Sequence, residues 1–327
     1  MNNTTVSKKR STSKTREVLP RLDTNPEIRE KILPYCRLKT GEVWTDPEGK
    51  HKIGLLDAGI SDDVKKLFRN KKVKLIVNDP PYNVVVGNVN TKSLSKTGID
   101  EYITFSKKWV TNVLDVMAAD SSLYVWLGAD QNDGFQPLPD FMIMMRQFNE
   151  LKPRSMITMR NQRGYGTQKN WMSVRQELLY YTIGKPPFKV VYTDIPKILK
   201  GYYKEINGRL TENIERSKSV NIRPGNVWVD IQQVFYRMEE NVPGAYAQKP
   251  LKSILRIIEA SSDKKDIVAD LFCHSGTTVI AAELLNRKCY AMEIDPVFAE
   301  LSIRRLEHYR KTGKTGWQWS TPFPEIK

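Results

Sequence analysis

The sequence predicts an α/β fold, with a mostly parallel sheet that is covered by helices on both faces. Short apolar runs that suit buried strands alternate with longer segments that suit amphipathic helices. This alternation favours parallel strands, because each helix crosses the sheet before the next strand begins. The chain has 327 residues, of which 40% are hydrophobic, so it can form one large domain or one domain with an insertion.

The first half of the chain establishes the alternating pattern. We expect strands at 52–56, 73–77, 122–127, 155–160 and 177–183, and helices at 61–70, 101–118 and 137–149. The helix at 101–118 has one apolar face, which includes Trp109, Val113 and Met117. Loops are expected at 165–175 and at 84–100, which is rich in Gly, Asn, Ser and Thr.

The second half resumes the pattern after an interruption. Residues 186–226 begin with two prolines and show weak periodicity, which predicts an inserted lobe. Helices are then expected at 250–261, 277–285 and 296–311, and strands at 266–272 and 288–294. The expected organisation is a flexible basic extension at 1–42, a domain built from 43–185 and 227–312, the lobe at 186–226 between these halves, and a tail at 313–327.

The charge of the chain points to a polyanionic partner. The net charge is +15, which favours nucleic acid but also fits a generally basic protein. Residues 152–185 contain seven Lys or Arg and one Glu, interleaved with Tyr165 and Trp171. Positive charge mixed with aromatic rings is typical of surfaces that bind phosphates and stack on bases.

Several classes of protein are disfavoured. No apolar stretch is long enough to span a bilayer, and the polar N-terminus does not resemble a secretory signal. The three cysteines and three histidines lack metal-site spacing, and no phosphate-binding Gly-Lys-Ser/Thr loop is present. The few cysteines favour a reducing compartment, so we expect a cytoplasmic, nucleoid-associated protein without a bound metal.

One candidate site is the tetrapeptide Asp79-Pro80-Pro81-Tyr82, which follows the apolar run at 73–77. The two prolines end the strand and fix a rigid turn at its carboxyl end. Ligands bind at this edge of open α/β sheets. A carboxylate, a proline carbonyl and an aromatic ring at one point suit a planar substrate with an amino group, although Tyr82 also fits a role in core packing.

A second candidate site runs from Asp270 to Thr278, between a strand and a helix. Gly276 allows close approach of a ligand, and Thr277 and Thr278 are expected to cap the helix, whose amides favour an anion. Glu293 ends the next strand, where an acidic residue is well placed to bind ribose hydroxyls. These residues predict a nucleoside cofactor, but they also fit an ordinary strand–helix turn.

Together, these motifs resemble the amino-directed DNA methyltransferases that use S-adenosylmethionine. The resemblance covers residues 50–310 and consists of the catalytic Asp-Pro-Pro-Tyr motif at Asp79–Tyr82, the cofactor loop at Asp270–Thr278, the ribose-binding acid at Glu293, the Gln-Lys-Pro motif at Gln248–Pro250, and the adenine-side acid at Asp57. The catalytic motif precedes the cofactor motif by roughly 190 residues, an order typical of the beta group. His274 and Leu271 depart from the family pattern, which usually has glycine and often proline there.

The resemblance implies a Rossmann-like, seven-stranded methyltransferase sheet with an inserted target-recognition lobe at 186–226. It implies that Asp79, Pro80, Pro81 and Tyr82 are catalytic, with Asp79 and the Pro80 carbonyl accepting the amine hydrogens while Tyr82 stacks on a flipped base. S-adenosylmethionine is expected to contact Asp57, Asp79, Lys249, Asp270, Phe272, His274, Ser275, Gly276, Thr277, Thr278 and Glu293. Double-stranded DNA is expected to contact Arg160, Arg163, Tyr165, Lys169, Trp171, Arg209 and Arg216.

The leading functional expectation is site-specific adenine-N6 methylation of DNA. The expected partners besides DNA are a cognate restriction endonuclease and a second copy of the chain. Cytosine-N4 methylation is the nearest alternative, but that group often has serine in place of Asp79. Protein-glutamine or RNA methyltransferases usually have asparagine before Pro-Pro-Tyr and place the cofactor loop first. An inactive DNA-binding relative is a further alternative.

Overall fold

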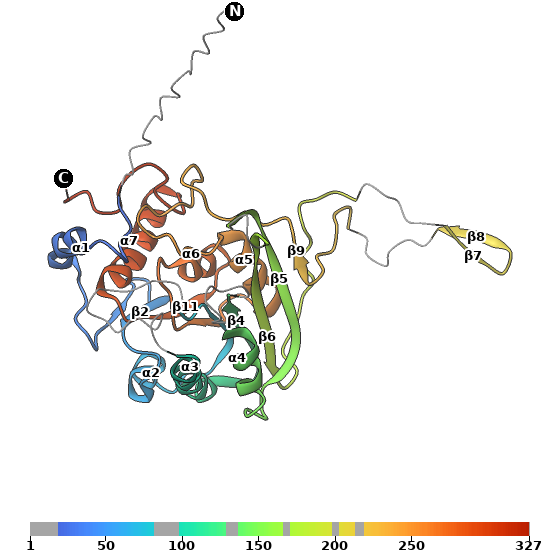
Figure 1. Ribbon diagram of the computed structural model, residues 1–327, viewed down its shortest axis with the longest axis horizontal. Helices are drawn as coiled ribbons and strands as arrows, with labels where there is room; N and C mark the ends of the chain where they lie inside the picture. The colour runs from blue at the N-terminus through green and yellow to red at the C-terminus, as the bar shows by residue number, and fades with distance from the viewer. Residues whose placement is uncertain are drawn as a thin grey trace, which may run out of the picture.

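The computed structural model describes residues 19–81, 98–128, 137–165, 171–197, 203–212 and 219–326. Several expectations fall outside these residues: the role of Tyr82, most of the loop at 84–100, and the DNA contacts of Lys169 and Arg216. The described helices and strands form one large sheet with helices on both sides and a long arm that projects from one edge (Figure 1).

A nine-stranded sheet is the centre of the molecule. Its order is β1 (Val43–Thr45), β2 (His51–Leu55), β11 (Lys288–Glu293), β10 (Ile267–Asp270), β3 (Val73–Asn78), β4 (Met117–Leu127), β6 (Ser173–Ile183), β5 (Lys152–Tyr165) and β9 (Val227–Trp228). The five strands from β2 to β4 in this order are mutually parallel. The seven expected strands are all present. The two additional strands are short segments that pair with the unpaired backbone groups of the sheet edges.

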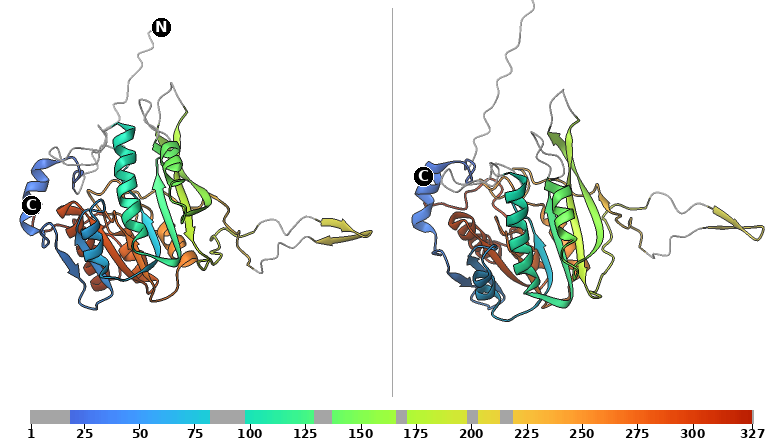
Figure 2. Two further views of the ribbon diagram at one scale, coloured as in Figure 1. Left: turned by 90° about the horizontal axis from the view of Figure 1, so that it is seen from below. Right: turned by 60° about the horizontal axis from the view of Figure 1, so that its bottom comes forward.

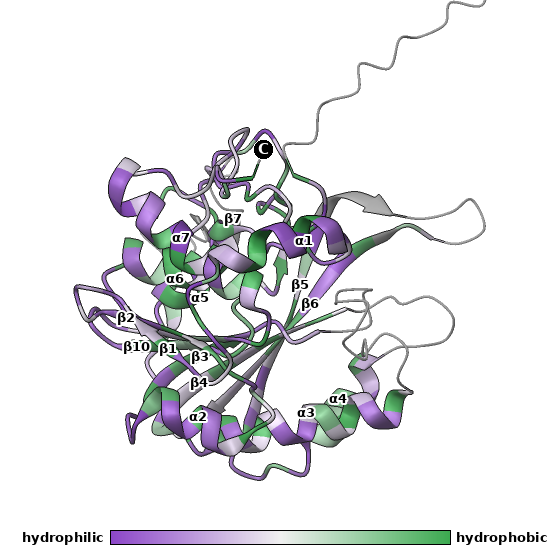
Figure 3. Cartoon of the chain, turned by 90° about the vertical axis from the view of Figure 1, so that its left-hand side faces the viewer, coloured by the Kyte–Doolittle hydropathy of each residue, from purple (hydrophilic) through white to green (hydrophobic). Residues whose placement is uncertain are grey.

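The helices form one layer on each face of the sheet. One layer contains α5 (Leu251–Ser261), α6 (Thr277–Leu284) and α7 (Pro296–Thr312), and the other contains α2 (Ser61–Phe68), α3 (Ile99–Leu114) and α4 (Pro137–Met145) (Figure 3). Alternate side chains of a strand point to opposite faces. Accordingly, Tyr124 and Trp126 of β4 pack in the apolar cluster under α5, and Leu123, Val125 and Leu127 pack in the cluster under α3 and α4.

The described residues of the expected inserted lobe at 186–226 form an extended arm without a core of its own. Among its described side chains only Thr193 is buried. A two-stranded hairpin, β7 (Tyr203–Ile206) with β8 (Arg209–Glu212), lies at the far end of the arm (Figure 1). At its base, Lys252 of α5 binds Asp194 at 2.6 Å and also contacts Asp230.

The strands expected at 155–160 and 177–183 are longer than expected and extend to the two ends of the loop expected at 165–175. β5 continues to Tyr165 and β6 begins at Ser173, so that these two strands form a hairpin that rises beyond β4 (Figure 2). Paired backbone groups continue to the register pair Tyr165–Ser173, with an irregularity after Arg160. The sequence pattern misses this extension because residues 161–165 and 173–176 do not alternate apolar and polar side chains.

The expectation of a flexible extension at 1–42 is wrong from residue 19 onward. Residues 19–42 include α1 (Pro26–Ile32) and a 3-10 helix (Leu33–Tyr35). Leu22 and Ile32 are fully buried in a cluster with Phe298 of α7 and Phe323 of the C-terminal tail. A few apolar side chains therefore pack residues 19–42 and the C-terminal tail against α7.

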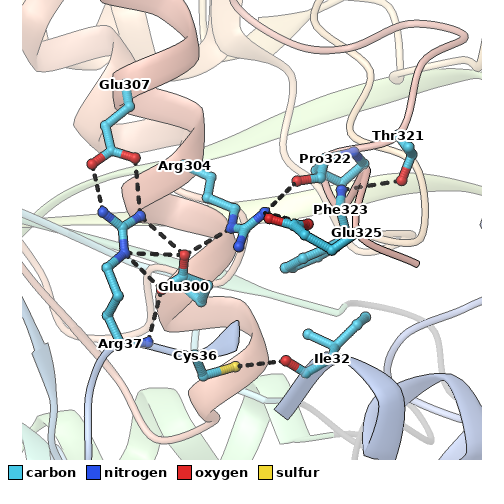
Figure 4. Close-up of polar contacts among 10 residues, drawn as sticks. All are labelled: Ile32, Cys36, Arg37, Glu300, Arg304, Glu307, Thr321, Pro322, Phe323 and Glu325. Atoms are coloured by element: carbon cyan, nitrogen blue, oxygen red, sulfur yellow. Dashed lines mark hydrogen bonds and ion pairs between the residues drawn. The ribbon is translucent and has the colours of Figure 1, made fainter. Parts of the chain in front are cut away.

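Ion pairs reinforce this terminal cluster (Figure 4). Arg37 binds Glu300 of α7 at 3.0 Å and Glu307, about two helical turns further, at 2.5 Å. Arg304 of the same helix binds Glu300 at 2.7 Å and Glu325 of the tail at 3.0 Å. The almost fully buried Glu300 thus joins the N-terminal segment, α7 and, through Arg304, the tail.

Candidate active site

The sheet topology brings the two candidate sites together. β3 and β10 are adjacent and parallel, with Leu75 opposite Val268 and Ile76 opposite Ala269. The carboxyl ends of these strands therefore meet at one edge, where β3 leads into Asp79 and β10 ends at Asp270. Asn78 bridges the two strand ends, because its Oδ1 accepts a hydrogen bond of 3.0 Å from the backbone N–H of Leu271.

Asp79 forms an ion pair with Lys249 across this edge. The Nζ of Lys249 lies 2.5 Å from Oδ2 of Asp79, and it also lies 5.6 Å from the ring centroid of Trp126 on β4. Pro80 is buried and Pro81 is half-buried, as expected for a rigid turn. The Gln-Lys-Pro motif, which immediately precedes α5, is thereby placed against the Asp-Pro-Pro-Tyr motif.

Asp270 is a buried carboxylate whose oxygens are both hydrogen-bonded. Thr278 Oγ1 donates to its Oδ2 at 2.5 Å, and the Phe272 backbone N–H donates to its Oδ1 at 3.0 Å. Burial raises the pKa of Asp270 to about 7, although these two donors oppose the shift. The nearby Asp79 raises this pKa further and Lys249 lowers it, so the three charged groups interact.

The turn after Asp270 requires glycine at position 276. Gly276 has a φ of 73°, in the left-handed region, and a Cβ atom here would lie 3.0 Å from Cα of Ser302 on α7. The expectation that Thr277 and Thr278 cap α6 is wrong, since Gly276 occupies the cap position and no side chain caps the helix. Both hydroxyls instead make tertiary hydrogen bonds: Thr278 donates to Asp270, and Thr277 accepts from Arg305 of α7 at 3.0 Å.

Glu293 fixes the backbone at the end of β11. Its Oε2 accepts from the His274 N–H at 2.8 Å, and its Oε1 accepts from the N–H groups of Ile294 and Asp295, each at 3.0 Å. Burial raises the pKa of Glu293 to about 7, and the nearby carboxylate of Asp295 contributes to this shift. The side chain remains partly exposed and is adjacent to Ile294, which is 67% exposed.

His274, which departs from the family pattern, faces α7. Its φ of 45° is left-handed, and its ring lies 4.2 Å from the ring of Phe298 between centroids. Burial lowers the pKa of His274 to about 4, so the imidazole is neutral near pH 7. The position accommodates a histidine because the ring packs on an aromatic side chain.

Asp57 lies at the same edge of the sheet. The Leu56 N–H donates to the backbone carbonyl of Glu293 at 3.0 Å, which places the end of β2 beside the end of β11. Asp57 Oδ1 accepts from Gly59 N–H at 2.7 Å and shapes the turn into α2. The structure therefore brings together the described residues that were expected to contact the cofactor.

The residues expected to contact DNA are not gathered in one place. Arg160 is exposed on β5, Trp171 is 93% exposed before β6, and Arg209 is exposed on the hairpin of the distant arm. The side chains of Arg163 and Tyr165 lie outside the described part of the structure.

The cavity between Asp79, Lys249 and Asp270 is small. It measures about 20 Å³, which is room for about one water molecule. A larger cavity of about 570 Å³ lies at the base of the arm, among Tyr180, Phe188 and Trp228, away from these carboxylates. The strand edge is the candidate site, because the charged motifs converge there.

Two residues of the candidate site escape the sequence motifs. Trp126 lies on β4 beside Lys249 and gives no signal other than that of a core aromatic residue. Arg305 is fully buried and donates to the Ser275 carbonyl and to Thr277 Oγ1, each at 3.0 Å. A helical arginine in the middle of the apolar face of α7 is the signal that indicates a buried polar partner.

Comparison with known proteins decides the family. The family model described as DNA methylase, of the N6/N4 type, matches residues 73–304. The chain belongs to this family. It is therefore a DNA methyltransferase, and residues 186–226 lie within the matched region.

Individual relatives agree with this membership. The chain is 26% identical to the type II methyltransferase M.HpaI of Haemophilus parainfluenzae over 74% of this chain and 70% of that protein. It is 28% identical to the DNA adenine methyltransferase YhdJ of Escherichia coli over 73% of this chain and 79% of that protein. The solved structure of the PvuII DNA methyltransferase, which is cytosine-N4-specific, shares the fold: its TM-score is 0.56 at 15% identity, over 79% of this chain and 86% of that chain.

None of the described helices is both long and apolar enough to cross a membrane.

Proposed function

We propose that this chain methylates the N6 amino group of adenine in duplex DNA at a specific sequence, with S-adenosylmethionine as the methyl donor. The observation that carries the proposal is the carboxylate of Asp79 at the end of β3, beside the turn that begins at Asp270. In the cytosine-N4 group the first position of this motif is often serine, so an aspartate favours adenine. YhdJ, whose name specifies adenine, supports the same choice.

The described residues fit S-adenosylmethionine. Glu293 offers partly exposed carboxylate oxygens for ribose hydroxyls, and the adjacent exposed Ile294 offers an apolar surface for the adenine ring. Lys249 offers a cation for the carboxylate of the methionine moiety. The turn residues Phe272, His274 and Ser275 line the same cavity as Lys249. When bound, this cofactor supplies an activated methyl group.

The exocyclic amine of adenine is a poor nucleophile, because its lone pair is delocalised into the ring. Asp79 and the Pro80 carbonyl accept the two amine hydrogens, which localises the lone pair on the nitrogen. This catalysis depends mainly on positioning and on charges that are placed in advance. Asp79 need not remove a proton beforehand, since the proton leaves readily after the N–C bond has formed.

The target base must leave the helix to reach this edge, at a cost of a few kcal/mol. We propose that Tyr82 stacks on the flipped base and that the arm at 186–226 reads the sequence. We further propose that the chain has a companion restriction endonuclease, because it is similar to type II methyltransferases. We also propose that it forms a homodimer.

The test is to identify the methylated nucleoside. The purified chain is incubated with duplex DNA and isotope-labelled S-adenosylmethionine, and the digested nucleosides are separated by mass spectrometry. N6-methyladenine is expected, whereas N4-methylcytosine would transfer the assignment to the cytosine group. The PvuII structure shows that the fold alone does not separate the two amines.

A further inference from the structure

We propose that the ammonium group of Lys249 exchanges partners when the cofactor binds. It leaves the carboxylate of Asp79 and pairs with the carboxylate of the methionine moiety. The exchange prepares Asp79 to accept the target amine. This inference rests on the proposed function and adds an order of binding to it. The cofactor must bind before Asp79 can hold the amine of the target base.

The starting arrangement is a largely buried ion pair. The Lys249 side chain is 9% exposed and that of Asp79 is 23% exposed, with 2.5 Å between Nζ and Oδ2. The oxygen that Lys249 contacts is one of the two through which Asp79 can accept a hydrogen bond from an amine. As long as the pair persists, an incoming amine competes with an ammonium group for Asp79.

The charges at this edge favour an exchange of partners. Two carboxylates, Asp79 and Asp270, face a single ammonium group, that of Lys249. Among the described residues that line this cavity, Lys249 is the only lysine or arginine. His274 also lines it, but its pKa is lowered to about 4, so it supplies no positive charge near pH 7. A third carboxylate, brought by the cofactor, would be buried without a cation unless Lys249 turned toward it.

The backbone around Lys249 is fixed, so the side chain can move alone. Gln248 accepts from the Val242 N–H at 3.0 Å and donates to the Glu240 carbonyl at 2.7 Å. The Lys249 carbonyl accepts from Thr277 Oγ1 at 3.5 Å. A lysine side chain has four rotatable bonds and can redirect its ammonium group without moving the chain.

The small volume of the cavity points in the same direction. About 20 Å³ remains between these side chains, which is room for about one water molecule. A ligand group that enters this space meets the ammonium group of Lys249 directly, because Lys249 lines it together with Asp79 and Asp270. Displacement toward the ligand carboxylate keeps that ammonium paired, and it leaves Asp79 facing the reacting groups.

The exchange is tested by calorimetry with two probes, S-adenosylhomocysteine and 5′-methylthioadenosine, which lacks the amino-acid moiety. Asp79→Asn removes the competing carboxylate, so it should bind S-adenosylhomocysteine several-fold more tightly than the wild type. Lys249→Met should bind it at least tenfold more weakly. Both variants should bind 5′-methylthioadenosine with wild-type affinity. A merely structural ion pair would instead lower the affinity of both variants for both probes.

The double variant Asp79→Asn/Lys249→Met keeps the test valid if Lys249→Met alone is unstable, because it leaves no unpaired buried carboxylate at position 79. Compared with Asp79→Asn, it should lose the affinity for S-adenosylhomocysteine and keep that for 5′-methylthioadenosine. Unchanged or weaker binding of S-adenosylhomocysteine by Asp79→Asn overturns the exchange. If the wild type still produces N6-methyladenine, that result leaves the proposed function intact, so the two failures are distinguishable.

Discussion

Thr278 Oγ1 donates a hydrogen bond of 2.5 Å to Oδ2 of Asp270, a carboxylate that is only 5% exposed at the carboxyl end of β10. This bond and the Phe272 N–H satisfy the carboxylate, but neither brings a positive charge. The loop that follows Asp270 is therefore built on a buried acid whose ionisation is costly.

Asp270 makes stability depend on pH. Burial raises its pKa from an ordinary value of 3.8 to about 7, and that of Glu293 from 4.5 to about 7. Between these values the folded chain holds more protons than the unfolded chain, so these two groups lower the free energy of unfolding as pH rises from about 4 to 7. Asp270→Asn should therefore be more stable than the wild type at pH 8, by about 2 kcal/mol.

Thermal unfolding at pH 5 and pH 8 checks this prediction. The exposed Asp140 provides the control, because Asp140→Asn should follow the wild type at both pH values. Equal pH dependence of Asp270→Asn and the wild type would show that Asp270 is not the titrating group.

Gly276 and Gly313 form a matched pair of left-handed glycines, with φ angles of 73° and 74°. A Cβ atom at Gly276 would lie 3.0 Å from Ser302, whereas at Gly313 nothing lies within 4 Å. Gly313→Ala should cost about 1 kcal/mol for its backbone conformation alone. Gly276→Ala should cost about 1–3 kcal/mol more, because it also overpacks the contact with α7. Urea denaturation compares the two, and equal losses would argue against the close approach.

Glu293 is expected to hold the ribose of the cofactor. Glu293→Ala removes this carboxylate and frees three backbone N–H groups, so calorimetry should show cofactor binding at least tenfold weaker. Glu307→Ala is the control, because Glu307 is a half-exposed acid on α7 that pairs with Arg37. The control should cost at most about 1 kcal/mol of stability and leave the affinity unchanged. Wild-type affinity in Glu293→Ala would exclude the ribose role.

The arm is expected to serve recognition rather than stability. Lys197 N–H donates to the Val220 carbonyl at 2.9 Å, so a deletion of residues 198–218 can be closed with two glycines. The described side chains of this segment lie on the β7–β8 hairpin and are exposed. The deletion should therefore change the melting temperature of the protein by less than a few degrees. Site-specific methylation should be lost while cofactor binding persists. Retention of the same methylated sequence would show that the arm does not read DNA.

Local pattern predicted the alternating elements where each has an apolar run or an apolar face. The segments at 73–77 and 266–272 contain the apolar runs of β3 and β10, but the pairing of these two strands was not predicted, because neither segment specifies its neighbour in the sheet. The contact between Lys249 and Asp79 was not predicted, because it joins residues 170 positions apart through side chains alone. Nothing local to either motif specifies that geometry.

The failures have related causes. Thr277 and Thr278 have the composition of helix caps, but Asp270 and Arg305 engage their hydroxyls instead. Leu22 and Ile32 stand in a segment too polar to predict packing, yet the surface of α7 buries them both. In each case a tertiary partner that is distant in sequence overrides the local preference.

The most direct test of the account is modification-sensitive sequencing of DNA from cells that express the wild-type chain or the Asp79→Ala variant. We predict N6-methyladenine at one recurring sequence in the wild type and none in the variant, with the variant still binding cofactor in calorimetry. N4-methylcytosine in the wild type, or undiminished adenine methylation in Asp79→Ala, would contradict the role of Asp79 as the group that holds the adenine amine.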